Sequence, residues 1–403
     1  MYKIRELLVI IIYFIVVYAE NNKLKSTITT DDLKQLRKYL FITQSYDKFV
    51  RPIPKSGGNT TVNIDFGLIH ITEFNVKSQT LTVEGWPKIN WTDDGLRWDN
   101  KEEFKNIAVL RMPSDQIYKP DLMAYNGIEH STTKMTNTNA LVYPNGMVLW
   151  VTPITLKALC KVDLSRWPYD RHLCFIQFGS WTMDGFTMDL TANNDGKSFL
   201  NNFYENTEFD VKFVNVTRVV KYYSCCTEPY PSVTYYFELQ RQPTLYHYTI
   251  TVPAIMAIIA SLAIFLLPVR SGLRFVLNSV SFIVLSSILV NLGAQFGVST
   301  LGVPVAVHFI SVSTLFVGLL QLWLTIAYST SFFPIRFIKV MFQTYRKTTT
   351  TEHEEQHLTK STKPEMEDIL KESDQTKSQI FVLIIDKFVF VVYVFALLYN
   401  LVV

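Results

Sequence analysis

The sequence has 403 residues, enough for two to three domains of ordinary size. Its 38 Lys and Arg against 35 Asp and Glu give a formal net charge of +3, and only 18% of the residues are charged, against about 25% in soluble domains. This composition excludes a disordered chain and a collagen, and the small net charge argues against a nucleic-acid-binding protein. Residues 275–335 contain no Asp, Glu, Lys or Arg, which indicates a membrane-embedded region.

The amino terminus has the features of a secretory signal. Two basic residues precede an apolar run from Leu7 to Tyr18, and the small residues Val17 and Ala19 fit signal-peptidase cleavage after Ala19. We therefore expect residues 1–19 to be removed and the following chain to lie outside the cell. The alternative is an uncleaved amino-terminal anchor.

The segment after the signal predicts one helix and then a β domain. Thr29–Thr30 would cap an amphipathic helix from Asp31 to about Tyr46. Residues 59–240 alternate apolar and polar side chains in short runs such as Val148–Val151, with turn residues between them. We expect an antiparallel, immunoglobulin-like β-sandwich preceded by the helix.

Four apolar stretches are long enough to cross a bilayer as helices, which takes about 20 residues. They are Tyr248–Leu267, Phe275–Gln295, Pro304–Tyr328 and Ile380–Val402. Basic residues follow the first and third stretches, at Arg270, Arg274, Arg336, Lys339, Arg346 and Lys347. The positive-inside rule makes that side cytoplasmic and both termini extracellular. Within the fourth stretch, the adjacent Asp386 and Lys387 are expected to snorkel towards the cytoplasmic surface.

The cysteines and the glycosylation sequons also indicate an extracellular domain. The four cysteines, at positions 160, 174, 225 and 226, form an even set that favours two disulfides over a metal site in an oxidising compartment. The sequons at Asn59, Asn90 and Asn215 all precede the first apolar stretch, as an extracellular domain requires.

One motif typical of an enzyme is interpreted as accidental. His353 and His357 flank two glutamates in the two-His, one-Glu pattern of zinc proteases, but they lie in a polar linker on the cytoplasmic side. No nucleophile elbow or phosphate-binding loop occurs. We expect no metal, no cofactor and no enzymatic activity.

The segment between Cys160 and Cys174 resembles the signature loop of the Cys-loop, pentameric ligand-gated receptors. It contains Asp163 and Trp167-Pro168-Tyr169-Asp170, where relatives have Phe-Pro-Phe-Asp. The order of sandwich, three close spans, cytoplasmic loop and fourth span is also similar. The adjacent Cys225-Cys226 resembles the alpha-type nicotinic acetylcholine receptor subunits, and the divergence elsewhere suggests an outlying invertebrate-type member. The resemblance implies two disulfides, Cys160–Cys174 and Cys225–Cys226.

The resemblance also implies a ligand site at a subunit interface. Acetylcholine carries a quaternary ammonium group with no hydrogen to donate, so aromatic faces are expected to hold it. The principal face would consist of Tyr125, Trp181, Tyr223, Cys225, Cys226 and Tyr230. The complementary face, from a neighbouring subunit, would consist of Trp86, Leu141, Leu149 and Val151. For each aromatic residue taken alone, packing in the core is the alternative.

Coupling and pore residues follow from the same resemblance. Coupling residues would be Arg241, Trp167, Pro168, Tyr169 and Pro304, and the pore would be lined by Leu273, Val276, Val280, Ile283, Ser287 and Ala294. A shift of one residue would line it with Leu277, Ser281, Val284 and Ile288 instead. Leu273 stands where cation-selective relatives have Glu, and neither register recovers an acid at the outer mouth.

The resemblance therefore predicts an acetylcholine-gated channel subunit that works in a heteropentamer whose partners supply acidic rings. Its parts would be an extracellular sandwich over 20–247, three spans over 248–330, a cytoplasmic loop over 331–379 and a fourth span over 380–403. Its surroundings would be the lipid bilayer of the postsynaptic plasma membrane. The alternatives are a ligand-binding subunit that contributes no ion pathway and, less favoured, an anion channel.

Overall fold

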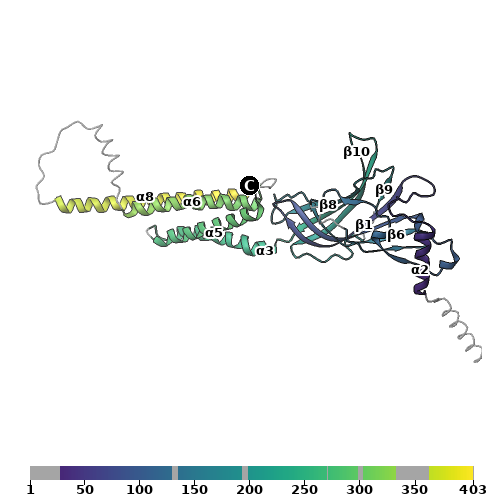
Figure 1. The fold of residues 1–403 in the computed structure, drawn as a ribbon. Helices are drawn as coiled ribbons and strands as arrows, with labels where there is room; N and C mark the ends of the chain where they lie inside the picture. Colours follow the sequence, from purple (N-terminus) through teal and green to yellow (C-terminus); the bar gives the residue numbers. More distant parts are fainter. Residues whose placement is uncertain are drawn as a thin grey trace, which may run out of the picture. The chain divides into compact units, whose positions relative to one another are not determined.

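The computed structural model describes residues 28–128, 135–192, 198–269, 271–297, 303–332 and 363–402 (Figure 1). The chain divides into two compact units. The sandwich unit runs to Lys161 and continues with His172–Leu239, whereas the helical unit combines Val162–Arg171 with the chain from Gln240 onwards. The expected signal at 1–19, Arg270 and the His353–His357 motif lie outside the described residues.

The sandwich unit begins with helix α2 (Thr30–Lys38), which continues as a π-helical turn over Tyr39–Thr43. Thr29 caps it as predicted, because its hydroxyl accepts a hydrogen bond from the N–H of Asp32 while its own N–H donates to the Asp32 carboxylate. The helix buries Leu36 and Leu40 completely. It ends three residues before the predicted Tyr46.

Two sheets form the body of the sandwich unit. In order across the first sheet, the strands are β3 (Leu110–Pro113), β5 (Asn139–Val142), β6 (Met147–Val151), β2 (Thr80–Thr92), β1 (Thr60–Asn75) and β9 (Met188–Thr191), with β7 (Ile154–Leu159) also paired to β2. The second sheet has the order β10 (Phe209–Tyr222), β11 (Pro229–Arg241), β8 (Arg171–Ser180) and β4 (Leu122–Ala124). The predicted sandwich is confirmed, with a parallel β1–β9 pair among antiparallel ones.

Aromatic side chains from the two sheets meet in the core. Phe66 of β1 lies 5.5 Å from Phe178 of β8 and 6.0 Å from Tyr235 of β11, measured between ring centroids, and all three are buried. Cys160 and Cys174 are bonded to each other and buried beside this core, as predicted. In the chain-entropy model, closing a loop of this size stabilises the fold by about 3 kcal/mol.

The helical unit contains four helices long and apolar enough to cross a membrane, judged by length and composition in the described residues. Its elements are α3 (Thr244–Tyr246), a π-helical turn (His247–Thr251), α4 (Val252–Ala263), a 3₁₀ turn (Ile264–Leu266), α5 (Gly272–Phe296), α6 (Val305–Phe332) and α8 (Lys363–Val402). The spans are Thr244–Leu266, Gly272–Phe296, Val305–Ser329 and Ile380–Asn400, within a few residues of those predicted.

Buried polar side chains join these helices. Asn278 of α5 donates a 2.6 Å hydrogen bond to Gln321 of α6, and Ser261 of α4 is 2.7 Å from the hydroxyl of Tyr393 on α8. The expectation that Asp386 would snorkel is wrong. Its side chain is buried because Arg274 provides an ion-pair partner inside the bundle, at 2.8 Å, whereas Lys387 is exposed.

Candidate ligand-binding site

The four predicted principal-face aromatics surround one cavity in the sandwich unit. The cavity has a volume of about 460 Å³. Its lining residues are Tyr125, Gln177, Ser180, Trp181, Lys221, Tyr223 and Tyr230. They come from the ends of β4 and β8 and from the segments on both sides of the β10–β11 turn, so the fold collects residues that lie far apart in the sequence.

Tyr125 is held in place by β8, the neighbouring strand of the sheet. Its N–H donates to the carbonyl of Gln177 at 2.7 Å, and its hydroxyl donates to the carbonyl of Ser180 at 2.5 Å. The ring fits only because residue 179 is glycine, since a Cβ there would overlap the Tyr125 ring and hydroxyl. Burial, with smaller effects from Tyr223 and Asp121, raises the pKa of Tyr125 to about 12, so its phenol is neutral near pH 7.

Asp121 fixes the segment that carries Trp181. Its carboxylate accepts from the Ser180 hydroxyl at 2.5 Å and from the Thr182 N–H at 2.8 Å, so it bridges the residues on both sides of Trp181. The Trp181 N–H also donates to the Asp121 carbonyl at 3.3 Å. These contacts hold the indole outward with 63% of its surface exposed. Sequence reasoning did not assign a role to Asp121. Its position four residues before Tyr125 was the one feature of the sequence that could have indicated a part in this site.

The β10–β11 turn carries the other two aromatics and the bonded pair Cys225–Cys226, which confirms the predicted disulfide between neighbours. Tyr223 and Tyr230 lie edge to face with their centroids 5.4 Å apart. The Cys226 N–H donates to the Tyr223 carbonyl at 3.1 Å, which closes the turn. The two rings therefore stand together on one side of the cavity, with Tyr125 and Trp181 completing it.

Aromatic faces around a cavity suit an organic cation. Each face contributes about 0.5 to 2 kcal/mol through its quadrupole, more when water is excluded. None of the described residues that line this cavity is Asp or Glu, so its aromatic faces are what can attract a positive charge. Among the described residues, no group of three His, Cys, Asp or Glu side chains could hold a metal ion.

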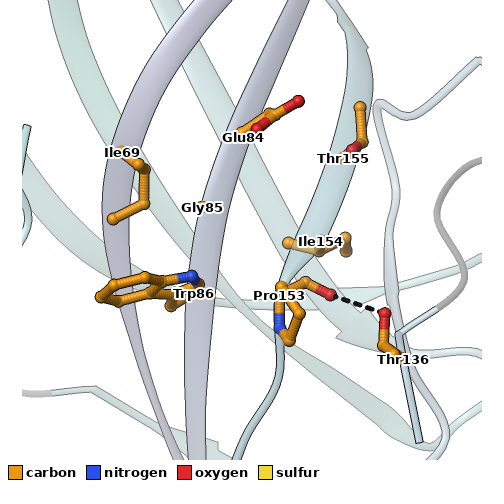
Figure 2. Close-up of a pocket in the computed structure, with 8 residues that line it drawn as sticks. All are labelled: Ile69, Glu84, Gly85, Trp86, Thr136, Pro153, Ile154 and Thr155. Atoms are coloured by element: carbon orange, nitrogen blue, oxygen red, sulfur yellow. Dashed lines mark hydrogen bonds between the residues drawn. The ribbon is translucent and has the colours of Figure 1, made fainter. Parts of the chain in front are cut away.

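Trp86 lines a second cavity, of about 200 Å³, on the outer face of the first sheet (Figure 2). The other lining residues are Ile69, Glu84, Gly85, Thr136, Pro153, Ile154 and Thr155. Glu84 projects from the same strand two residues before Trp86 and lies opposite Thr155 of β7. This cavity shares no residue with the first, so Trp86 does not complete the aromatic cage of its own chain. Sequence reasoning missed Glu84.

The remaining predicted complementary residues share the outer face of this sheet with Trp86. Leu149 of β6 pairs with Leu141 of β5, and Val151 pairs with Lys88, two residues after Trp86. All three side chains are partly exposed, whereas their strand neighbours Val142, Val148 and Trp150 are buried. The structure therefore brings the four predicted residues onto one face.

The predicted glycosylation sites differ in their surroundings. Asn215 is exposed on β10. Asn59 is partly buried and donates from its side chain to the Gly185 carbonyl at 3.1 Å. Asn90 is paired with Leu149 and points to the same outer face of β2 as Lys88 and Trp86, which are two and four residues away in the strand. It therefore lies on the predicted complementary surface.

The predicted coupling residues meet inside the helical unit. Arg241 donates from Nε to the Asp170 carboxylate at 2.9 Å, and both side chains are buried. Trp167 packs edge to face against Tyr246 and Phe296, with centroids 5.0 and 5.1 Å away. These contacts join the tip of the Cys160–Cys174 loop to helices α3 and α5.

Two further contacts involve the same loop tip. The hydroxyl of Tyr169 is 2.9 Å from Nε2 of His247, just after α3. Pro304 is buried and immediately precedes Val305, whose N–H donates to the Ser165 carbonyl at 3.1 Å. The loop tip therefore contacts the start of α6 as well.

Helix α5 exposes the residues of the ungapped pore alignment. These residues are Leu273, Val276, Val280, Ile283, Ser287 and Ala294. In the shifted register, Ser281 is buried and donates to the Leu277 carbonyl at 3.0 Å, and the other three are partly buried. The exposed stripe is apolar up to Ser287 and contains no carboxylate.

The sequence pattern of the neurotransmitter-gated ion-channel ligand-binding domain matches residues 34–243, more than half of the chain. The chain belongs to this family of ligand-gated ion channels, which are not enzymes. It is similar to acetylcholine receptor subunit alpha-type acr-16 of Caenorhabditis elegans, with 33% identity over 62% of this chain and 50% of the relative.

Two further relatives come from other animal groups. Acetylcholine receptor subunit alpha-L1 of Schistocerca gregaria is 32% identical over 60% of this chain and 44% of the relative. Neuronal acetylcholine receptor subunit alpha-2 of Gallus gallus is 32% identical over 60% of this chain and 45% of the relative. The matches span half or less of these proteins. With its four candidate spans, the chain is a multi-pass membrane protein.

Proposed function

We propose that the chain is an alpha-type subunit of a pentameric channel gated by acetylcholine or a related quaternary ammonium compound. The observation that carries this proposal is the 460 Å³ cavity, in which Tyr125, Trp181, Tyr223 and Tyr230 stand together beside the bonded pair Cys225–Cys226. The names of the similar alpha subunits support the same ligand.

In this proposal the cage supplies the principal half of a site that a neighbouring subunit completes. The open side of the cage leaves Trp181 exposed to such a neighbour. On the other face, Trp86, Leu141, Leu149 and Val151 would play the complementary part for the next subunit around the ring. A ligand closed between the two faces loses water, which strengthens its contact with each aromatic ring.

Coupling to the membrane helices would pass through the tip of the Cys160–Cys174 loop. The buried Arg241–Asp170 pair and the Trp167 contacts attach this tip to α3 and α5. A displacement of the loop on ligand closure would therefore act directly on the pore helix. The receptor would lie in the postsynaptic plasma membrane. Both of its termini would lie outside the cell, because the basic residues after the first and third spans favour a cytoplasmic position for those loops.

The pore helix supports assembly with other subunits. Rings of carboxylates attract cations into such a pore, whereas an apolar constriction gates by losing water. The exposed stripe of α5 begins with Leu273 and contains no acid. We therefore propose a heteropentamer in which partner subunits supply the acidic rings.

Currents evoked by acetylcholine test this function. The full chain is expressed in oocytes alone and with individual alpha- and non-alpha-type subunits, and the reversal potential is measured under cation and anion gradients. We expect cation-selective current only with partners, abolished by Trp181→Ala in this chain. Leu273→Glu is expected to raise the current of the chain alone. Robust cation current from the unmodified chain alone would refute the heteropentamer.

The alternative function is a ligand-binding subunit that assembles but contributes little conduction. The acid-free stripe of α5 favours it as well. In that case Trp181→Ala would change the acetylcholine sensitivity of a heteropentamer, whereas Leu273→Glu would leave its conductance unchanged. An anion channel is less favoured, because Arg274 is buried against Asp386 and does not place its charge on the exposed stripe.

A further inference from the structure

Among the described residues, Lys221 is the one charged residue that lines the aromatic cage. It lies near the end of β10, two residues before Tyr223, and both side chains line the same cavity. Its side chain is exposed, and no acidic side chain of the described residues forms an ion pair with it. The aromatic cavity, which suits an organic cation, is therefore lined by a positively charged lysine as well.

Several other polar groups in the cavity are already bonded within the protein. The side-chain amide of Gln177 donates to the Ser232 hydroxyl at 2.9 Å. The Ser180 hydroxyl donates to Asp121 and accepts from the Met183 N–H, and the Ser180 carbonyl accepts from Tyr125. The Lys221 ammonium, with three N–H donors, is thus the strongest polar group left to bind a ligand.

We infer that the preferred ligand of this cage is a zwitterion with a quaternary ammonium group and a carboxylate joined by a short chain. This inference rests on the proposed function and narrows its ligand class. The aromatic rings would hold the ammonium group, and Lys221 would bind the carboxylate by a charge-assisted hydrogen bond. A ligand with only a positive charge is repelled by Lys221, whereas a zwitterion neutralises it.

The test uses three quaternary ammonium probes. Trimethylglycine has the required carboxylate, its amide (carbamoylmethyl-trimethylammonium) replaces that charge with a neutral group of nearly the same shape, and acetylcholine represents the plain cations. Equilibrium binding of each is measured on membranes from cells expressing the full chain with its partner subunits. The decisive quantity is the ratio of the affinity for trimethylglycine to that for its amide.

For the unmodified chain we expect a ratio of about threefold to tenfold, the range of a partly exposed charge contact. Lys221→Arg should keep the ratio, Lys221→Gln should bring it close to one, and Lys221→Glu should invert it. The control Lys212→Gln removes a lysine from the same strand that is paired with Asp210 and lies outside the cavity. It should leave the ratio unchanged.

The outcomes separate this inference from the proposed function. If acetylcholine and the amide bind as well as trimethylglycine, or if the Lys221 variants weaken all three probes equally, the ligand class is wrong and the proposed function stands. Equal weakening would assign Lys221 to a contact with the neighbouring subunit. If none of the three probes binds to correctly inserted protein, both proposals are overturned.

Discussion

The guanidinium of Arg274 on α5 donates from Nη2 to Oδ2 of Asp386 on α8 at 2.8 Å, and both side chains are buried. Nε of Arg274 donates to the Ile264 carbonyl at 2.8 Å, and the indole N–H of Trp323 donates to the other Asp386 oxygen at 3.3 Å. Three spans and the turn after the first are thereby joined at one point. The pair also directs the Arg274 charge away from the exposed stripe of α5.

Removal of one partner of this pair should destabilise the helical unit. Asp386→Asn leaves the Arg274 charge buried without compensation, which costs about 3 to 5 kcal/mol in comparable cases. We expect a lower thermal unfolding temperature of the purified full chain and less protein at the cell surface. The exposed neighbour Lys387 provides the control, since Lys387→Gln changes an adjacent charge that is not buried.

A second variant distinguishes the buried charge from a general defect in α8. The double change Arg274→Met with Asp386→Leu removes both charges and should recover most of the lost stability. Equal unfolding temperatures of Asp386→Asn and Lys387→Gln would show that the pair contributes little.

Asp170→Asn should impair gating more than ligand binding. It leaves Arg241 buried beside an uncharged partner, and neither residue lines the aromatic cage. We expect the maximal acetylcholine-evoked current per surface receptor to fall about tenfold or more in the heteropentamer, with binding affinity changed less than about threefold. Arg166→Gln, an exposed charge in the same loop, should alter neither quantity. A parallel loss of binding would place the pair in the ligand site instead.

Gly179→Ala should weaken ligand binding by moving Tyr125. The added methyl group would overlap the ring and hydroxyl of Tyr125, so this aromatic face would leave the cage. A loss of about threefold to thirtyfold in acetylcholine affinity is expected from the contribution of one ring. Gly67→Ala is the matched control, because a Cβ there meets its nearest neighbour, the Ser198 carbonyl, at 3.5 Å. Unchanged affinity in Gly179→Ala would contradict the role of Tyr125.

We expect Asn215 to carry a glycan and Asn90 to carry none. Asn215 is exposed, whereas Asn90 is partly buried on the face that carries Trp86 and lies opposite Leu149. A glycan at Asn90 would occupy the surface that a neighbouring subunit needs. We expect mass spectrometry of glycopeptides from surface receptors to find glycan on Asn215 and none on Asn90. Full occupancy of Asn90 would close this face and exclude Trp86 from the ligand site.

Local patterns in the sequence were sufficient for much of the fold. Thr29 predicted the start of the first helix, because a threonine hydroxyl can cap a helix whose first residues follow it directly in the chain. The uncharged segment 275–335 predicted two of the spans, and the alternation of residues around Val148–Val151 predicted strands with one buried side. The marker Cys225-Cys226 predicted the disulfide between neighbours, which the structure confirms.

Contacts between distant residues could not be predicted in this way. Asp386 next to Lys387 was interpreted as a pair near the membrane surface, and only the packing of α5 against α8 identifies Arg274 as its partner. Which side of α5 is exposed likewise depends on the rotation of the helix about its axis, which places Val280 outward and Ser281 inward.

The sequence by itself determined the class of this protein, since the order of sandwich and spans, the cysteine spacing and the aromatic residues can all be identified along the chain. The tertiary structure decided which polar groups remain available. It shows that Gln177 and Ser180, which line the cage, are hydrogen-bonded to Ser232 and Asp121, while Lys221 lines it unpaired by any acid among the described residues. The physical reason is that charge and hydrogen-bond complementarity depend on distances in space between strands that are separated by many residues in the chain.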